Sequence, residues 1–146
     1  MRPRMEFAVS ARRLDAHGSL ARCKDAEIVL DTDLAGRRDA FNPAELLLAA
    51  LSACMIKGIE RVCPILEFSF RGVAVRIHGV RRDVPPGMES IDYEIVVDTD
   101  ESDQRLEVLH DNVRRYGTVF NTVAPGTSLS GTLRRAASGE TAVVDP

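Results

Sequence analysis

An almost uninterrupted run of apolar side chains in the first half of the chain predicts a long buried helix. Between Leu46 and Met55, only Ser52 and Cys54 carry polar side-chain atoms. A helix that is apolar on every side has no face to offer to solvent, so we expect this one to be buried all round. We predict that it runs from about residue 43 to about residue 62.

Both ends of this helix are marked by residues that favour helix starts and stops. Asn42 is a good N-cap, Pro43 suits the first helical position, and Glu45 can close a capping box with Asn42. Pro64 lies just beyond the expected end, where prolines often follow a helix. The sequence by itself therefore explains Glu45 as part of the helix start.

Alternating apolar and polar positions on either side of the helix predict strands. Before the helix, Phe7, Val9 and Ala11 alternate, and Arg13 continues their face if the strand runs that far. A hairpin is expected around 15–19 and a polar loop over 33–40. Further strands are expected over 20–23, 27–31, 68–77, 91–97 and 129–133.

A stripe of apolar residues predicts a second helix over about 102–116. Its apolar positions recur every three or four residues from Leu106 to Tyr116, as one face of a helix requires. Gly117 follows as a natural residue to end it, and a short helical turn is expected over 119–123. The order strands, helix, strands, helix, strand is that of an α+β protein rather than of alternating parallel α/β units.

Length and composition predict a single domain spanning residues 1–146. Apolar residues make up 45%, charged residues 28%, and the formal net charge is −3, which is ordinary for a globular protein. The chain lacks the basic runs of nucleic-acid-binding proteins, the roughly 20-residue apolar window of a membrane span, and the apolar core of a signal peptide. We therefore expect a cytoplasmic protein that binds neither nucleic acid nor membrane.

The three cysteines, Cys23, Cys54 and Cys63, do not form a disulfide framework, because their number is odd and their spacing irregular. On one continuous helix, Cys54 and Cys63 would face opposite sides about 13.5 Å apart along the axis, beyond the reach of a disulfide. We expect Cys23 and Cys63 to be inert. The histidines are scattered, so we predict no metal site and no cofactor.

Cys54 is the candidate for chemistry because it lies in the middle of the apolar helix. A cysteine reacts as its thiolate, and apolar burial disfavours that charged form. A cation from another part of the fold must therefore stabilise the thiolate. The alternative is that Cys54 packs as a small hydrophobic residue with no reactivity. The candidate cations are Arg12 or Arg13 at the end of the first strand and Arg37 or Arg38 in the loop before the helix.

Two motifs resemble those of the OsmC/Ohr family, the osmotically inducible and organic hydroperoxide resistance proteins. The segment from Asn42 to Cys54, NPAELLLAALSAC, resembles the helix motif of the family, and YGTVFNT at 116–122 resembles its second motif. Within the family, the helix motif at 42–54 most resembles that of the OsmC-like branch. The resemblance implies an α+β fold of antiparallel sheets wrapped around a buried central helix. It also implies an intertwined homodimer with two active sites built from both chains.

The resemblance also implies an activity. Cys54 falls where the family has its peroxidatic cysteine, whose thiolate attacks an organic hydroperoxide, releases an alcohol and is left as a sulfenic acid. The implied catalytic residues are Cys54, an activating arginine and Glu45. Subgroups of the family draw the arginine from different segments, so Arg13 and Arg38 both remain candidates. The implied partners are a second copy of the chain, a small-molecule hydroperoxide and an external thiol reductant.

Two positions depart from the family pattern. The second cysteine, which resolves the sulfenic acid, matches Gly117, and the catalytic glutamate ten residues before the cysteine matches Ala44. Glu45 lies about 180° around the helix from Cys54, so it can act only on the partner subunit's Cys54. Two hypotheses follow. The chain is a one-cysteine peroxidase recycled by an external thiol in oxidative-stress defence, or it is a non-catalytic small-ligand-binding or structural dimer.

Overall fold

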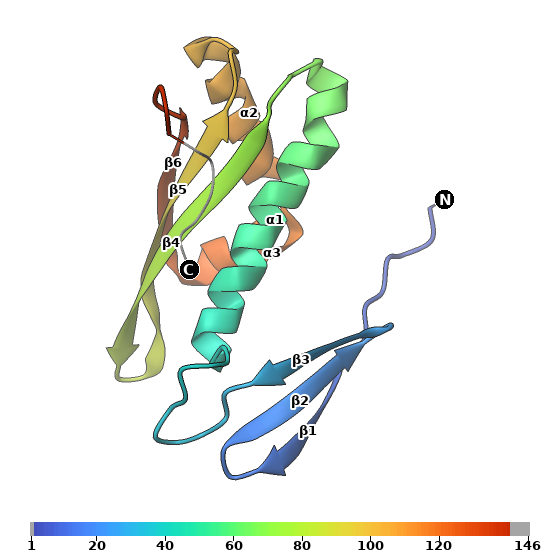
Figure 1. Ribbon diagram of the computed structural model, residues 1–146, viewed down its shortest axis with the longest axis vertical. Helices are drawn as coiled ribbons and strands as arrows, with labels where there is room; N and C mark the ends of the chain where they lie inside the picture. The colour runs from blue at the N-terminus through green and yellow to red at the C-terminus, as the bar shows by residue number, and fades with distance from the viewer. Residues whose placement is uncertain (1, 141–146) are drawn as a thin grey trace. The chain divides into compact units, whose positions relative to one another are not determined.

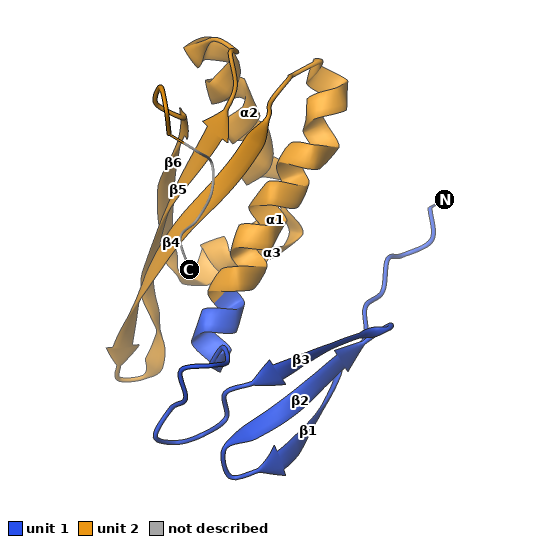
Figure 2. Cartoon of the chain, in the orientation of Figure 1, with its two compact units in different colours: residues 1–47 blue, residues 48–146 orange. Residues whose placement is uncertain are grey.

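The computed structural model describes residues 2–140 as six strands, three α-helices and a short 3-10 helix (Figure 1). The chain divides into two compact units, residues 1–47 and 48–146 (Figure 2). Residues 1 and 141–146, the ends of the expected domain, lie outside the described part. In order, the elements are β1 (Ser10–Asp15), β2 (Gly18–Cys23), β3 (Ala26–Leu30), α1 (Pro43–Leu66), β4 (Gly72–Asp83), β5 (Pro86–Asp98), α2 (Asp103–Tyr116), α3 (Thr118–Val123), η1 (Ala124–Gly126) and β6 (Ser128–Arg135).

The first unit is an antiparallel sheet in the order β1–β2–β3. The hairpin expected around 15–19 is confirmed, because β1 and β2 are joined there by a two-residue turn. Phe7 and Val9, however, precede the first strand, whose pairing begins at Ser10 opposite Arg22. Their alternation overestimates the strand, because β2 ends at Cys23, one residue beyond the partner of Ser10, and so offers Phe7 no partner.

Most side chains of this first unit are exposed in the single chain. Ala21 is the one buried apolar side chain among its described residues, and Leu14, Ile28 and Val29 are each close to half exposed. A sheet with so little buried apolar area has almost no core of its own. It therefore needs another surface to cover it.

The second unit is a three-stranded sheet, β4–β5–β6, with helices packed on one face (Figure 1). The inward positions Ile91, Tyr93 and Ile95 of β5 alternate with the polar Asp92 and Glu94, as predicted, but Val96 is buried as well. The inward side chains join those of α1, α2 and α3 in one apolar cluster. Its members include Leu51, Met55, Ile59, Ile91, Tyr93, Ile95, Val97, Leu106, Leu109, Val113 and Phe120.

This second sheet is mixed rather than wholly antiparallel. β4 and β5 form an antiparallel hairpin, but β5 and β6 run parallel, with Ile91 opposite Leu129 and Ile95 opposite Leu133. The chain leaves β5 through α2, α3 and η1 before it returns as β6. Helical crossovers of this length allow the returning strand to run in the same direction.

Helix α1 is covered on one side only, so the expectation that it is buried all round is wrong for the single chain. Leu51, Met55 and Ile59 are buried against the sheet. Ala53 and Ile56, on the other side, are exposed. The second unit supplies one sheet, and one sheet can bury only one face of a helix. The apolar side chains on the other face of α1 therefore point away from the sheet and are exposed in the single chain.

The helix also continues past its expected end. It includes Pro64 and stops at Leu66. Glu67 then adopts a left-handed backbone with φ of 51°, and the Phe68 N–H donates to the Cys63 carbonyl at 2.9 Å. This is the Schellman arrangement that closes helix ends. Pro64 removes the N–H that would donate to the Glu60 carbonyl, and the helix ends two residues later.

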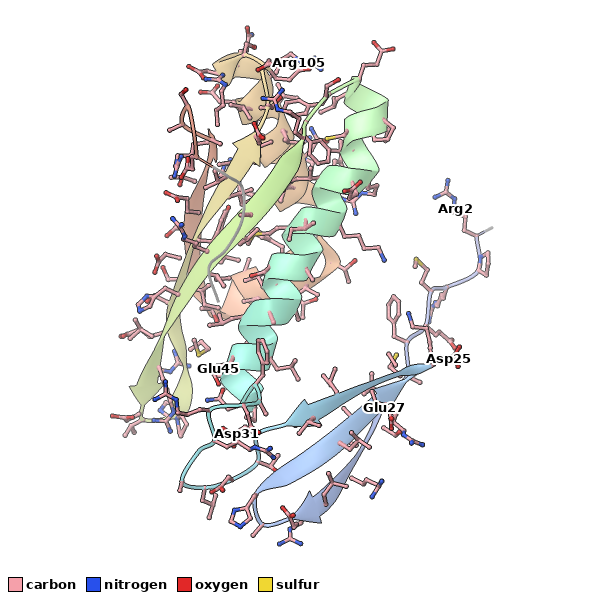
Figure 3. The ribbon with its side chains drawn as sticks, viewed as in Figure 1. Arg2, Asp25, Glu27, Asp31, Glu45 and Arg105 are labelled. Atoms are coloured by element: carbon pink, nitrogen blue, oxygen red, sulfur yellow. The ribbon has the colours of Figure 1, made fainter. Side chains whose placement is uncertain are left out.

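Arg105 of α2 ties the end of α1 to the start of α2 (Figure 3). Its Nη2 donates to the carbonyls of Leu66 at 2.7 Å and Glu67 at 3.1 Å, and its Nε donates to Glu101. The guanidinium also lies 5.7 Å from the centre of the Phe68 ring. One side chain thus satisfies carbonyls that the helix end leaves without intrahelical donors.

Replacing Arg105 by alanine is expected to lower the free energy of unfolding by about 2 kcal/mol, because the Leu66 and Glu67 carbonyls lose a charged donor. Urea denaturation measures this loss. Arg114→Ala is a matched control on the same helix, since its pair with Asp111 is exposed and is expected to contribute less than about 1 kcal/mol. Equal losses in the two variants would contradict the role of Arg105.

The predicted second helix is confirmed as α2, which begins after the N-cap Ser102. The short turn expected over 119–123 is confirmed as α3, over Thr118–Val123. Within residues 2–140, no helix is long and apolar enough to cross a membrane.

Candidate functional site

Cys54 lies in the middle of α1, half-buried at the edge of the apolar core and without a disulfide. Its sulfur lies close to Gly117, the residue between α2 and α3. A Cβ atom built on Gly117 would lie 3.1 Å from the Cys54 Sγ. The sulfur therefore faces the backbone where α2 ends and α3 begins. We call this junction around Gly117 the α2–α3 corner.

Small residues bring α1 and α2 close enough for this contact. Gly58 lies one turn after Cys54, and a Cβ there would lie 3.8 Å from Cγ2 and 3.9 Å from Cα of Val113. Val113 in turn lies one turn before Gly117. The contacts pair Cys54 with Gly117 and Gly58 with Val113, so the two helices run antiparallel. This packing sets the thiol beneath the α2–α3 corner.

Gly117 serves close packing rather than an unusual backbone conformation. Gly117 ends α2 as predicted, but its φ of −79° and ψ of 121° are extended rather than left-handed. A Cβ atom here would meet Phe120 Cβ at 3.0 Å, Cys54 Sγ at 3.1 Å and the Val113 carbonyl oxygen at 3.2 Å. These distances are tighter than ordinary contacts, so only glycine fits without a shift.

The 3.1 Å separation between a Cβ at position 117 and the Cys54 Sγ is also that of a disulfide bond. Two cysteines joined by an S–S bond of about 2.05 Å hold the Cβ of one about 3 Å from the Sγ of the other. Position 117 therefore lies at disulfide range from Cys54, although this chain carries no sulfur there. The position that matches the second family cysteine is thus a direct neighbour of Cys54.

The other two cysteines lie in different settings. Cys63 is 4% exposed, and burial, followed by the charges of Glu60 and Glu101, raises the pKa of its thiol to about 11. It is therefore protonated at neutral pH and a poor nucleophile. Cys23 lies at the end of β2 in the first unit. The expectation that both are inert remains a prediction.

The four candidate arginines belong to the first unit and differ in what they already bind. Arg37 is engaged, since its Nε and Nη2 donate to the two carboxylate oxygens of Asp39 at 2.6 and 2.8 Å. Arg12, Arg13 and Arg38 are exposed, and none of them has an ion pair or a side-chain hydrogen bond among residues 2–140. These three therefore remain available to bind another group, and Arg37 does not.

Arg13 differs from Arg38 in its surroundings. It lies on β1 opposite Ser19, and Ala11, two residues earlier, lies opposite Ala21. Ala21 is in turn opposite Ile28 of β3. Because side chains alternate across a sheet, Arg13 shares its face with small and apolar residues. A second surface that covers this face would bring the guanidinium into an apolar setting.

Glu45 caps its own helix, as predicted (Figure 3). The Asn42 N–H donates to Glu45 Oε1 at 3.0 Å, and the Glu45 N–H donates to Asn42 Oδ1 at 2.8 Å. This reciprocal pair satisfies two backbone donors at the helix start. Within its own chain Glu45 therefore has a structural role, and its catalytic role remains a prediction.

A group of aromatic residues near the α2–α3 corner was not predicted from the sequence. Tyr93 Oη and His110 Nε2 are 2.7 Å apart and share a hydrogen bond, and the Tyr93 ring meets Phe120 edge-on at 6.2 Å. One signal could have found Tyr93: a glycine, Gly131, in the strand beside it. In the register of the sheet, these two residues are directly opposite.

Among residues 2–140, no group of three or more histidine, cysteine or acidic side chains is arranged to hold a metal ion.

Comparison with known proteins identifies the family. The family model described as OsmC-like protein matches residues 36–130, which include α1, α2, α3 and the Gly117 position. No curated protein matches the chain.

Solved structures share the fold at low identity. An OsmC-like protein from Mycoplasma pneumoniae is 17% identical with a TM-score of 0.83, over 91% of this chain and 99% of that one. An organic hydroperoxide resistance protein OsmC from Legionella pneumophila is 15% identical with a TM-score of 0.68, over 91% and 99%. The organic hydroperoxide resistance protein OhrB of Bacillus subtilis is 16% identical with a TM-score of 0.64, over 88% and 98%.

Proposed function

Because the chain belongs to the OsmC-like protein family, we propose that it reduces organic hydroperoxides at the single thiol of Cys54. One observation carries the proposal: the half-buried Cys54 sulfur lies beside Gly117, the position that matches the second cysteine of the family. Two proteins of the same fold are named as organic hydroperoxide resistance proteins. The apolar residues of α1 around the thiol suit an alkyl or aryl group on the substrate.

The proposed step transfers one oxygen atom to sulfur. The Cys54 thiolate attacks the terminal oxygen of the hydroperoxide, so that an S–O bond forms while the O–O bond breaks. The alkoxide takes a proton and leaves as an alcohol. The substrate is thereby reduced by two electrons, and Cys54 is oxidised to a sulfenic acid.

Recycling then needs a thiol from outside the chain. Gly117 has no sulfur, and Cys63 is buried and protonated at neutral pH. A first external thiol condenses with the sulfenic acid, which forms a mixed disulfide and releases water. A second external thiol then attacks that disulfide, which returns Cys54 to the thiol and yields the disulfide of the reductant.

We infer that the site is completed by a second copy of the chain. The outward face of α1, with Ala53 and Ile56, and the sheet of the first unit both leave apolar side chains exposed. We propose that a cytoplasmic homodimer buries both the outward face of α1 and the sheet of the first unit. Residues 1–146 would then act as a single domain within that dimer. Arg13 of one protomer would then stabilise the thiolate of the partner's Cys54, with Glu45 available from the same protomer.

Arg13→Ala is expected to slow hydroperoxide consumption at neutral pH by about 100-fold, the order expected when a thiolate loses a nearby cation. Arg13→Lys retains the charge and should recover part of the rate. Arg38→Ala is the matched control, because Arg38 is also exposed and unpaired among residues 2–140 but lies in the loop before α1. Steady-state rates measure the difference. A larger loss in Arg38→Ala would assign the role to that arginine instead.

A second candidate function is binding without turnover. Gly117 and Ala44, where the family pattern has a cysteine and a glutamate, favour it. In that case the protein binds a small apolar ligand saturably, or serves as a structural dimer, and consumes no hydroperoxide. Consumption of cumene hydroperoxide with a small dithiol, compared between wild type and Cys54→Ser, separates the two functions.

A further inference from the structure

Tyr93 lies where β5, α2 and α3 meet. Its hydroxyl shares a 2.7 Å hydrogen bond with His110 of α2, and its ring meets the His110 ring edge-on at 5.8 Å. On α3, the Phe120 ring lies edge-on to Tyr93 at 6.2 Å. One side chain of the sheet thus contacts both helices that form the α2–α3 corner.

The position of Tyr93 is fixed by its surroundings. It is 4% exposed, and a Cβ on Gly131 of β6 would lie 2.4 Å from the Tyr93 Cγ. The absence of a side chain at Gly131 therefore gives the ring its space. A ring held in this way has few other rotamers, so its hydroxyl remains directed to His110.

Burial keeps both partners uncharged at neutral pH. It raises the pKa of Tyr93, against a smaller opposing effect of Arg114. It also lowers the pKa of His110, helped by Arg114 and opposed by Asp111. The bond thus joins two neutral groups, whichever ring donates the proton. Loss of His110 would leave the buried Tyr93 hydroxyl without its bond, and loss of the Tyr93 hydroxyl would leave the half-buried His110 ring without it.

The corner that Tyr93 holds is also the surface against the Cys54 sulfur. The Cβ position of Gly117 is 3.0 Å from Phe120 Cβ and 3.1 Å from Cys54 Sγ. Phe120 is itself 8% exposed. Movement of α3 away from the sheet would therefore move both Phe120 and Gly117 relative to the sulfur.

We propose that Tyr93 and His110 are positioning residues for Cys54, whose shared hydrogen bond holds the α2–α3 corner closed over the sulfur. The inference rests on the proposed function in one respect, that Cys54 is the reactive group. In this proposal, Tyr93 of the sheet and His110 of α2 control how accessible the Cys54 thiol is to solvent and substrate. They do so by holding α2 and α3 in place, without touching the substrate themselves.

The test measures the rate at which iodoacetamide alkylates Cys54, followed by peptide mass spectrometry so that Cys23 and Cys63 are scored separately. Tyr93→Phe and His110→Leu each remove the hydrogen bond and are expected to speed alkylation about fivefold, the factor by which one lost bond raises the population of an opened corner. His110→Gln provides both a donor and an acceptor, so it should restore the wild-type rate within about twofold.

Val97→Ala is the matched control, because Val97 is fully buried on the same face of β5, four residues from Tyr93. Urea denaturation of every variant accounts for global stability. The inference is overturned if Tyr93→Phe leaves the rate unchanged, if Val97→Ala raises it as much, or if His110→Gln behaves like His110→Leu. Hydroperoxide turnover is assayed separately, so a protein that fails there but shows these alkylation rates loses the proposed function and keeps the positioning role.

Discussion

Cys54→Ser is expected to lower hydroperoxide consumption by at least about 1,000-fold, down to the rate of the reductant alone, as loss of a catalytic nucleophile does in other enzymes. The reason is chemical rather than steric. A serine hydroxyl has nearly the size of a thiol, but it does not ionise near neutral pH, and it cannot carry the oxygen as a sulfenic acid. Consumption of cumene hydroperoxide with excess dithiol measures the loss.

Two further cysteine variants show whether this effect is specific. Cys63→Ala removes a buried, protonated thiol, and Cys23→Ser removes one at the end of β2. Both should retain turnover within about threefold, apart from any loss of folded protein. If Cys54→Ser matches the wild-type rate, or if Cys63→Ala abolishes turnover, Cys54 is not the reactive thiol.

Gly117→Cys is expected to form a disulfide with Cys54 under mild oxidation. The Cβ of the new residue would lie 3.1 Å from the Cys54 Sγ, which is the separation that an S–S bond requires. The bridge would close a loop of about 60 residues, and such a loop constrains the unfolded chain by about 4 kcal/mol. Intact mass and the thermal midpoint with and without reductant measure both effects.

Gly117→Ala separates the sulfur from the packing. Its Cβ meets the same crowded atoms of Phe120 and Val113, so the variant should lose about 1–3 kcal/mol of stability whether reductant is present or not. Reduced Gly117→Cys should be destabilised in the same way, and only its oxidised form should gain stability. A Gly117→Cys protein whose two thiols stay free under oxidant would show that the corner does not hold position 117 against Cys54.

Local patterns in the sequence were enough to predict features whose interacting residues lie close together along the chain. The capping box of Asn42 and Glu45 forms as predicted, because both partners lie within one helical turn. The apolar stripe of α2 likewise depends only on spacing along a single helix. Features that a few neighbouring residues determine can be recognised without knowing the rest of the fold.

Features that depend on distant partners could not be found this way. Gly117 follows a helix and so suggests a helix terminator. A side chain is also excluded there because the Cys54 sulfur of α1 lies too close, and the local sequence does not reveal that contact. Tyr93 fits a regular strand pattern, and nothing along the chain joins it to His110. The exposed face of α1 also could not be foreseen, because the composition of a helix does not say how many of its sides the same chain covers.

The most direct test of a single reactive thiol is to treat the reduced wild-type protein with one equivalent of cumene hydroperoxide and no added thiol. With no sulfur at position 117 to consume it, the sulfenic acid should persist. The intact protein should then gain one oxygen atom, and dimedone should label Cys54 alone. A protein that gains no oxygen and takes up no dimedone at Cys54, while the hydroperoxide remains, would contradict the account.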